Sequence, residues 1–155
     1  MNGPEFGPAP GERKLSTISK SEADRLVAEL LPLMPTRRAA KRIQELYEQS
    51  GSPVAVFLYF EDVNPAADDI EAKFHGSYYG SYTRDEVIQI GIEIAGYDVE
   101  LERFLEERGL PERALDWDFD ALWPAIREQY FLVQEDHYFH VFDAALAPSP
   151  KREGA

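Results

Sequence analysis

Hydrophobic side chains in the first third of the chain recur at helical spacing. Leu26, Leu30 and Leu33 lie on one side of a helix until the prolines of residues 32–35 interrupt it. A capping box at residues 21–24 predicts where this helix begins. The pattern therefore indicates one amphipathic helix that ends in a sharp turn.

A second helix is predicted over residues 37–49. Thr36 can cap its beginning, and Gly51 ends it at the C′ position. Its apolar side is formed by Ala40, Ile43 and Tyr47. Four bases stand at its front, where the helix dipole disfavours cations: Arg37, Arg38, Lys41 and Arg42. Two interpretations of these bases stay open, a binding role and a solvated helix face.

Two apolar segments predict β-strands. Residues 54–60 form a continuous apolar run, partly β-branched, between Gly-Ser-Pro and Glu-Asp. Residues 138–142 supply a final strand close to the end of the chain. We therefore expect an α+β fold that is rich in helices and contains a small antiparallel sheet built from these two segments.

The segment that follows the first predicted strand indicates a short helix and a turn. Asn64 can cap the helix, Pro65 occupies its first position, and Gly76 ends it. Residues 78–82, Tyr-Tyr-Gly-Ser-Tyr, then predict a turn that is dense in aromatic side chains.

Residues 87–95 fit both a strand and a helix. Isoleucine occupies every second position from Ile88 to Ile94, which is a strand pattern. A second capping box, Thr83 with Glu86, and a closing glycine favour a helix. Helix is the interpretation that we prefer.

Two further helices are predicted before the final strand. Residues 98–109 form the first of them, and its inner stripe consists of Leu101, Phe104 and Leu105. Residues 118–130 form the second, in which Pro124 marks either a kink or a late helix start.

The composition divides the chain into four parts. We expect a disordered leader at residues 1–18, a small helical part with one strand at residues 19–60, an acidic α+β domain at residues 61–146 and a tail at residues 147–155. The beginning of the chain lacks the apolar segment of a secretory signal, and the longest apolar run is far shorter than the roughly 20 residues of a membrane helix. The chain has no cysteine, which fits a cytoplasmic protein.

Charge is distributed very unevenly along the chain. The net charge is −13, yet residues 1–50 carry seven acids and eight bases, a net charge of +1. Residues 61–143 carry 21 acids and six bases, a net charge of −15. Such a surface repels nucleic acid and attracts proteins that have basic surfaces. Because a helix rises about 1.5 Å per residue, acids along adjoining helices can approach the charge density of duplex DNA, about one charge per 1.7 Å.

The motifs of common enzymes are absent from the sequence. No phosphate-binding glycine loop and no G-x-S-x-G elbow is present. His137 and His140 would point to opposite faces of a strand, so they do not share a metal ion easily. Adjacent carboxylates are expected by chance among 29 acids, and a hydrolase would need one of them to be buried. We therefore expect a protein that is not an enzyme and has no cofactor and no metal.

A set of short motifs in the second half resembles the C-terminal half of ArdA-type antirestriction proteins, over about residues 61–143. The motifs are Phe74, Tyr79-Gly80-x-Tyr82, an acidic capped helix that ends in Gly96-Tyr97, an acidic segment with Trp117 and Phe119, Tyr130, and His140-Val141-Phe142. Residues 1–60 show no such likeness. Proteins of this family, which are encoded by mobile elements, mimic bent duplex DNA as dimers. They occupy the DNA-binding groove of type I restriction-modification enzymes.

The resemblance implies a DNA mimic without catalytic activity that binds a type I restriction-modification enzyme, or another DNA-binding protein, and forms a homodimer. The carboxylates expected to contact the partner are Glu61, Asp62, Asp68, Asp69, Glu71, Asp85, Glu86, Asp98, Glu100, Glu102, Glu106, Glu107, Asp116, Asp118 and Asp120. The alternative is an acidic adaptor or immunity-type protein that binds a basic protein partner through a few residues. A small hydrolase is the third hypothesis.

Overall fold

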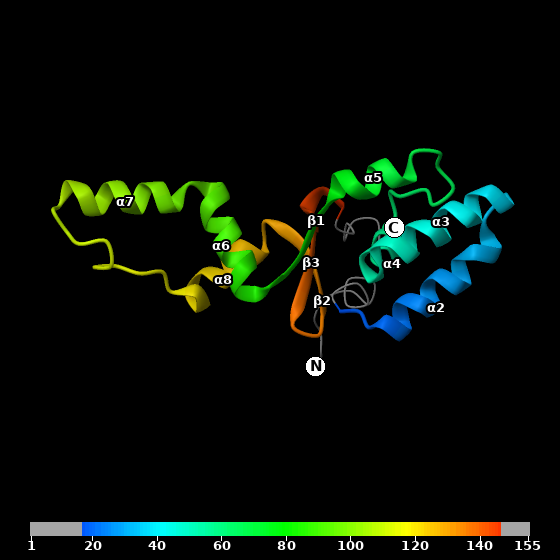
Figure 1. Cartoon of the computed structure of the whole chain (residues 1–155), viewed down its shortest axis with the longest axis horizontal. Helices are drawn as coiled ribbons and strands as arrows, with labels where there is room; N and C mark the ends of the chain where they lie inside the picture. Colours follow the sequence, from blue (N-terminus) through cyan, green and yellow to red (C-terminus); the bar gives the residue numbers. More distant parts are fainter. Residues whose placement is uncertain (1–16, 147–155) are drawn as a thin grey trace, which may run out of the picture.

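Helices make up most of residues 17–146, which is the part of the chain that the computed structural model describes (Figure 1). The α-helices are α2 (Lys20–Leu30), α3 (Arg37–Ser50), α4 (Ser52–Leu58), α5 (Ile70–Ser77), α6 (Arg84–Ala95), α7 (Tyr97–Glu107) and α8 (Phe119–Arg127). Two short 3-10 helices are η1 (Leu31–Leu33) and η2 (Ala144–Leu146). The strands are β1 (Tyr78–Thr83), β2 (Tyr130–Glu135) and β3 (Tyr138–Asp143). The expected α+β class with a small antiparallel sheet is confirmed.

The sheet has the order β1-β3-β2, and both pairings are antiparallel. The β2–β3 hairpin turns at Asp136, which has a φ of 55°. The predicted aromatic turn at residues 78–82 is wrong, because these residues form the edge strand β1. Strand β1 pairs with β3, and the register of this pairing shifts beside Gly80. Gly80 has a φ of 117°, and the shift accommodates this glycine within the strand.

Helix α4 occupies the segment that was predicted as the first strand. Gly51, at a φ of 76°, separates α3 from α4, and Pro53 stands in the first turn of the helix. Every residue of α4 is buried, so the segment lacks the polar face that reveals a helix in a sequence. A short apolar run of this kind fits a buried strand and a buried helix equally well.

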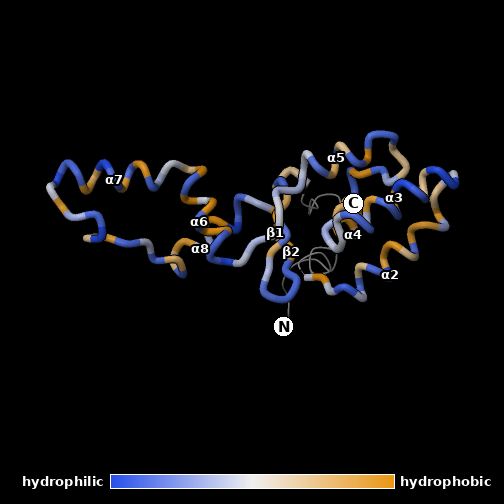
Figure 2. The backbone as a smooth tube through the Cα atoms, viewed as in Figure 1, coloured by the Kyte–Doolittle hydropathy of each residue, from blue (hydrophilic) through white to orange (hydrophobic). Residues whose placement is uncertain are grey.

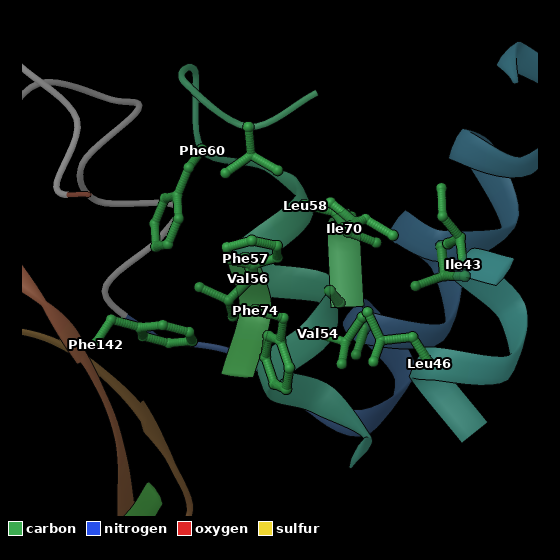
Figure 3. Packing of buried hydrophobic residues seen from close by; sticks show 14 of the residues in the cluster. Ile43, Leu46, Val54, Val56, Phe57, Leu58, Phe60, Ile70, Phe74 and Phe142 are labelled. Atoms are coloured by element: carbon green, nitrogen blue, oxygen red, sulfur yellow. The ribbon is translucent and has the colours of Figure 1, made fainter. Parts of the chain in front are cut away.

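The larger hydrophobic core lies between α2–α5 and one face of the sheet (Figure 3). Phe57 of α4 packs edge-on against Phe60 and Phe74, with ring centroids 6.3 and 5.4 Å apart. Phe60 then meets Phe131 and Phe142 of the sheet at 5.2 and 5.4 Å. The sequence predicted a domain boundary after residue 60, and this core contains residues from both sides of that position. The boundary itself stays a prediction.

A smaller core lies on the opposite face of the sheet. Helices α6 and α8 cover this face with Val87, Ile88, Ile92 and Ile126, which pack against Val141 of β3. The helical interpretation of residues 87–95 is therefore confirmed. Pro124 lies inside α8, which begins at Phe119, so a late helix start is wrong.

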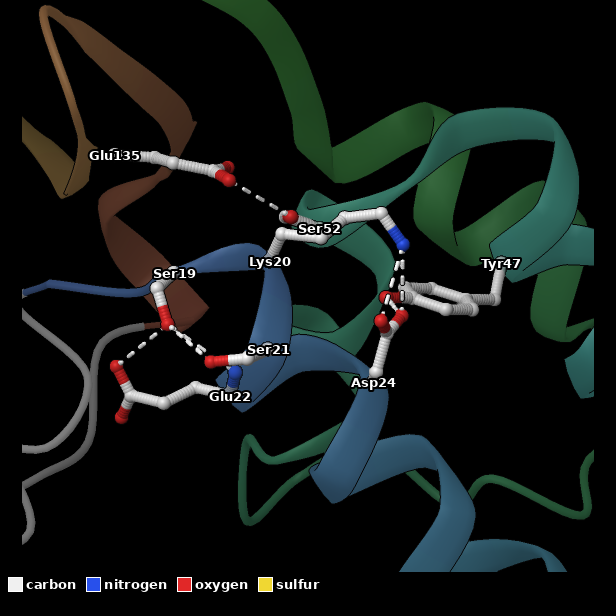
Figure 4. Close-up of polar contacts among 8 residues, drawn as sticks. All are labelled: Ser19, Lys20, Ser21, Glu22, Asp24, Tyr47, Ser52 and Glu135. Carbon is white, nitrogen blue, oxygen red and sulfur yellow. Dashed lines mark hydrogen bonds and ion pairs between the residues drawn. The ribbon is translucent and has the colours of Figure 1, made fainter.

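Side-chain hydrogen bonds at the N-caps fix where several helices begin. Thr36 accepts a hydrogen bond from the backbone N–H of Ala39, and the box of Thr83 and Glu86 is complete. The first cap is Ser19 and not Ser21, as its hydroxyl accepts from the N–H of Glu22 (Figure 4). Asn64 does not begin a helix: its side chain accepts from the N–H of Ala66 in a turn, and α5 starts only at Ile70.

Polar contacts fasten α2 to its neighbours. Asp24 accepts a hydrogen bond from the Tyr47 hydroxyl of α3 and pairs with Lys20 at 2.9 Å (Figure 4). Ile18, which the sequence placed in the leader, is buried and donates its N–H to the carbonyl of Gln134 at 2.9 Å. The rest of the predicted leader and the predicted tail fall at residues 1–16 and 147–155, outside the described residues.

A buried polar network joins the sheet to α4. His140 is 6% exposed, and its Nε2 lies 2.8 Å from Oε1 of Glu135. Its Nδ1 lies 2.6 Å from the Ser81 hydroxyl. The second oxygen of Glu135 accepts a hydrogen bond from Ser52 at the start of α4 (3.2 Å). Both nitrogens of the buried imidazole are therefore partnered, as burial requires.

Gly91 sets the distance between α6 and α8. A Cβ added at Gly91 would lie 2.6 Å from Cδ1 and 3.0 Å from Cγ2 of Ile126, which is 2% exposed. We expect Gly91→Ala to destabilise the wild-type chain by about 1 kcal/mol or more, because overpacking outweighs the gain in helix propensity. In an Ile126→Ala background the same change should stabilise by up to about 1 kcal/mol.

Urea unfolding of the two single variants and the double variant measures this coupling. Ile126→Ala alone should cost about 2–5 kcal/mol. Effects of Gly91→Ala that are equal in the two backgrounds would contradict the close packing of these helices.

Candidate partner-binding surface

Helix α7 and the segment that returns from it extend away from the sheet at one end of the elongated molecule (Figure 1). We name residues 97–118 the acidic arm, since they carry eight acidic and three basic side chains, a net charge of −5. Hydrophilic and hydrophobic positions alternate along this arm (Figure 2). On α7 only Leu105 is buried, so the predicted inner stripe is correct for Leu105, while Phe104 is 37% exposed.

The carboxylates of α7 form two rows. Because successive residues of a helix turn by about 100°, Asp98, Glu102 and Glu106 follow one side, and Glu100 and Glu107 follow the other. Within residues 17–146, no hydrogen bond or ion pair engages the side chains of Glu100, Glu102, Glu106 and Glu107. Arg103, the base within α7, likewise makes no hydrogen bond or ion pair in this part of the chain. Arg108, at the end of the helix, places its guanidinium over the Phe104 ring at 4.1 Å.

Other predicted contact residues are paired with arginine. Arg42 of α3 holds Glu71 through two contacts, Nη2 to Oε1 at 2.7 Å and Nε to Oε2 at 3.1 Å. Its Nη1 also lies 3.5 Å from Asp68. Arg84 meets Asp120 at 2.7 Å and Asp85 at 3.5 Å. These pairs contribute less negative potential than the acids of α7.

Several more of the predicted acids serve the local backbone. Glu86 completes the capping box of α6, and Asp118 caps α8 by accepting the N–H of Ala121 at 3.1 Å. Asp98 and Asp116 each accept the N–H of the next residue, at 2.9 and 2.8 Å. Asp69 precedes α5 without a side-chain cap, and Glu61 and Asp62 lie exposed in the turn after α4.

The arm cleft is a feature that the sequence reasoning missed. It has a volume of about 450 Å³ and lies between α7 and the returning segment. Its lining consists of Asp98, Val99, Leu101, Glu102, Leu105, Glu106, Leu110, Glu112 and Trp117. Trp117 is half-buried: it packs against the smaller core and lies beside Tyr97, with ring centroids 6.3 Å apart. The i, i+4 repeat of Asp98, Glu102 and Glu106 on α7 was the signal that could have identified the acidic side of this cleft.

No protein-family model, curated protein or solved structure gives a significant match to this chain. The described residues also contain no group of three His, Asp or Glu side chains arranged to hold a metal ion. No helix within residues 17–146 has both the length and the apolar character needed to cross a membrane.

Ser81, His140 and Glu135 form a hydroxyl–imidazole–carboxylate chain, which bears on the hydrolase hypothesis. In serine hydrolases the serine faces Nε2 and the acid faces Nδ1, whereas here the ring is turned the other way. Neither the arm cleft nor an apolar cleft of about 280 Å³ beside Tyr79 and Ile94 includes Ser81 in its lining. His137 lies in the turn before β3, apart from the buried His140. The network therefore favours a structural role.

The Arg42–Glu71 contact makes stability depend on pH. The Arg42 guanidinium lowers the pKa of the Glu71 carboxyl below its ordinary value. A carboxyl with a lowered folded-state pKa contributes stability above its unfolded pKa, about 4.3, and this contribution is lost as the pH falls through the folded pKa. We expect Glu71→Gln to lower the free energy of unfolding at neutral pH, with a difference from wild type that shrinks in this acid range.

Urea unfolding between neutral and acid pH measures the effect. Glu45→Gln is the matched control, because Glu45 is an exposed acid of α3 without an ion pair in the described structure. A loss of stability that is the same for both variants, or that does not change with pH, would contradict a stabilising role of the Arg42–Glu71 contact.

Proposed function

We propose that this chain is an ArdA-like DNA mimic that inhibits a type I restriction-modification enzyme by occupying its DNA-binding groove. The observation that carries this proposal is the set of α7 carboxylates that have no partner within residues 17–146. Their charge is left for a partner to neutralise. The resemblance of the short motifs in residues 61–143 to those of the ArdA family supports the same function.

The spacing of these charges suits a cleft that binds DNA. Helix α7 has 11 residues and therefore a length of about 16 Å. It carries five acids and one base, Arg103, so its acids are spaced at about one per 3.3 Å. One strand of DNA carries one phosphate per 3.4 Å. The acids of α7, counted over both of its sides, therefore have about the axial density of the phosphates of one DNA strand. Along one side they recur every four residues, about 6 Å apart.

The energetics favour a role in binding over a role in stability. Like charges at i, i+4 spacing, such as Asp98 with Glu102 and Glu102 with Glu106, each destabilise a helix by a few tenths of a kcal/mol. No described contact offsets this repulsion within the arm. A basic groove would remove it and would release counterions, as it does with DNA.

The proposal includes a setting for the protein. A type I restriction-modification enzyme acts on DNA inside the cell, so the inhibitor would be cytoplasmic. The resemblance to the family extends the proposal to a homodimer, which places two acidic arms in one assembly. No direct contact with nucleic acid is proposed, because the arm repels phosphate.

An acidic adaptor that binds a basic, non-nucleic-acid partner is the second candidate. The arm cleft favours it, since a pocket with an aromatic side chain is typical of a binding hot spot. Charge variants separate the two functions. A mimic loses affinity gradually as acids are removed, and a hot-spot binder loses most of it at one or two positions.

The central prediction concerns salt and competition. Binding to a type I restriction-modification enzyme should exclude a duplex that carries its recognition site. For about six phosphate-like contacts, the affinity should fall roughly 10³-fold between about 50 and 200 mM salt. Fluorescence anisotropy of labelled duplex in competition with the full chain measures both effects, and inhibition of DNA cleavage gives the functional result.

The control replaces acids away from the arm. Glu45→Gln with Glu48→Gln removes two charges from α3 and should leave inhibition nearly unchanged. Replacement of Glu100 and Glu107 by glutamine removes two charges from the arm and should reduce the affinity and the salt dependence. A complex that is insensitive to salt, or one that binds duplex at the same time, would falsify the proposal.

A further inference from the structure

The arm cleft combines two chemical features that a purely electrostatic surface does not need. Four carboxylates form its rim: Asp98, Glu102 and Glu106 from α7, and Glu112 from the returning segment. No lysine or arginine belongs to its lining. A ligand that enters the cleft must therefore bring positive charge.

The floor of the cleft is apolar. Leu105 is buried at its base, while Val99 and Leu110 remain 54% and 41% exposed. Trp117 presents a half-buried indole to the same space. Burial of these exposed side chains by a ligand would remove apolar surface from water, which is favourable at about 25 cal/mol per Å². A hydrated ion would not cover this surface, so the ligand must also carry an apolar part.

We propose that the arm cleft binds an arginine side chain of the partner protein together with a neighbouring aliphatic side chain. The inference rests on the proposed function only in that the partner is a protein with a basic surface. The inference adds which side chain of the partner the arm cleft selects, and by what chemistry.

Arginine fits the cleft better than lysine does. Its guanidinium is planar, so it can bind a carboxylate through two parallel hydrogen bonds and also stack on an aromatic face. The rim supplies the carboxylates of Glu102 and Glu106, and Trp117 supplies the aromatic face. An ammonium group is more strongly hydrated and has no plane to stack. The volume, about 450 Å³, lies within the range of sites that enclose small ligands.

The experiment uses the full chain and three short capped peptides with an alanine background. The first carries arginine and leucine, the second carries lysine and leucine at the same positions, and the third carries arginine without leucine. Calorimetry measures the three affinities on the wild-type chain. In a Trp123→Phe variant Trp117 is the remaining tryptophan, and its fluorescence reports whether the peptide reaches the cleft.

A matched pair of variants tests the rim. Glu102→Gln with Glu106→Gln and Glu100→Gln with Glu107→Gln remove the same charge from the same helix, but only the first pair lines the cleft. We expect the arginine–leucine peptide to bind about tenfold more tightly than each of the other two. The first pair, and Trp117→Leu, should weaken it by about tenfold more than the second pair does. Circular dichroism of each variant checks its folding.

The outcomes separate this inference from the proposed function. Equal affinity of the arginine and lysine peptides, equal loss in both pairs of variants, or no peptide binding would overturn the cleft as an arginine site. Salt-dependent competition with duplex would still stand in that case. Conversely, a chain that selects the arginine–leucine peptide but does not inhibit a type I enzyme would overturn the DNA mimic and retain the cleft as a site for a basic protein.

Discussion

The fold depends on one strand that serves two hydrophobic cores. Successive side chains of a strand point to opposite faces of the sheet, so Phe142 of β3 enters the larger core and Val141 enters the smaller one. Strand β3 is also the central strand, paired with β1 on one side and with β2 on the other. Because both faces are covered, β3 connects helices α2–α5 to helices α6 and α8. The acidic arm lies between α6 and α8 in the chain, so its position depends on this sheet.

The polar network at His140 acts at the same place. His140 shares the face of β3 that Phe142 uses, so its imidazole is buried beside the larger core and requires partners for both nitrogens. Glu135 and Ser81 provide them, and Ser52 ties Glu135 to the beginning of α4. The network therefore connects all three strands to α4, the most buried helix. Its hydrogen bonds fix how the sheet and α4 are placed against each other, in addition to the hydrophobic packing between them.

The acidic arm follows a different physical rule. It is anchored through α6 and α8, but most of α7 and of the returning segment stays exposed. An arm with few buried side chains keeps its carboxylates in water, where they stay available to a partner. In the proposed function, stability comes from the sheet and its two cores, and recognition comes from the arm.

Local sequence signals were sufficient for the helices that have a cap and a polar face. Thr36 with Gly51, and Thr83 with Glu86, place α3 and α6 correctly because a cap depends only on residues a few positions apart. The acids of α7 were likewise visible as a helical repeat. The identity of α4, the pairing of residues 78–83 as β1 and the arm cleft were not predictable in this way. Each depends on residues distant in the chain: complete burial removed the periodicity of α4, β3 supplied the partners of β1, and the return of Trp117 alongside α7 created the cleft.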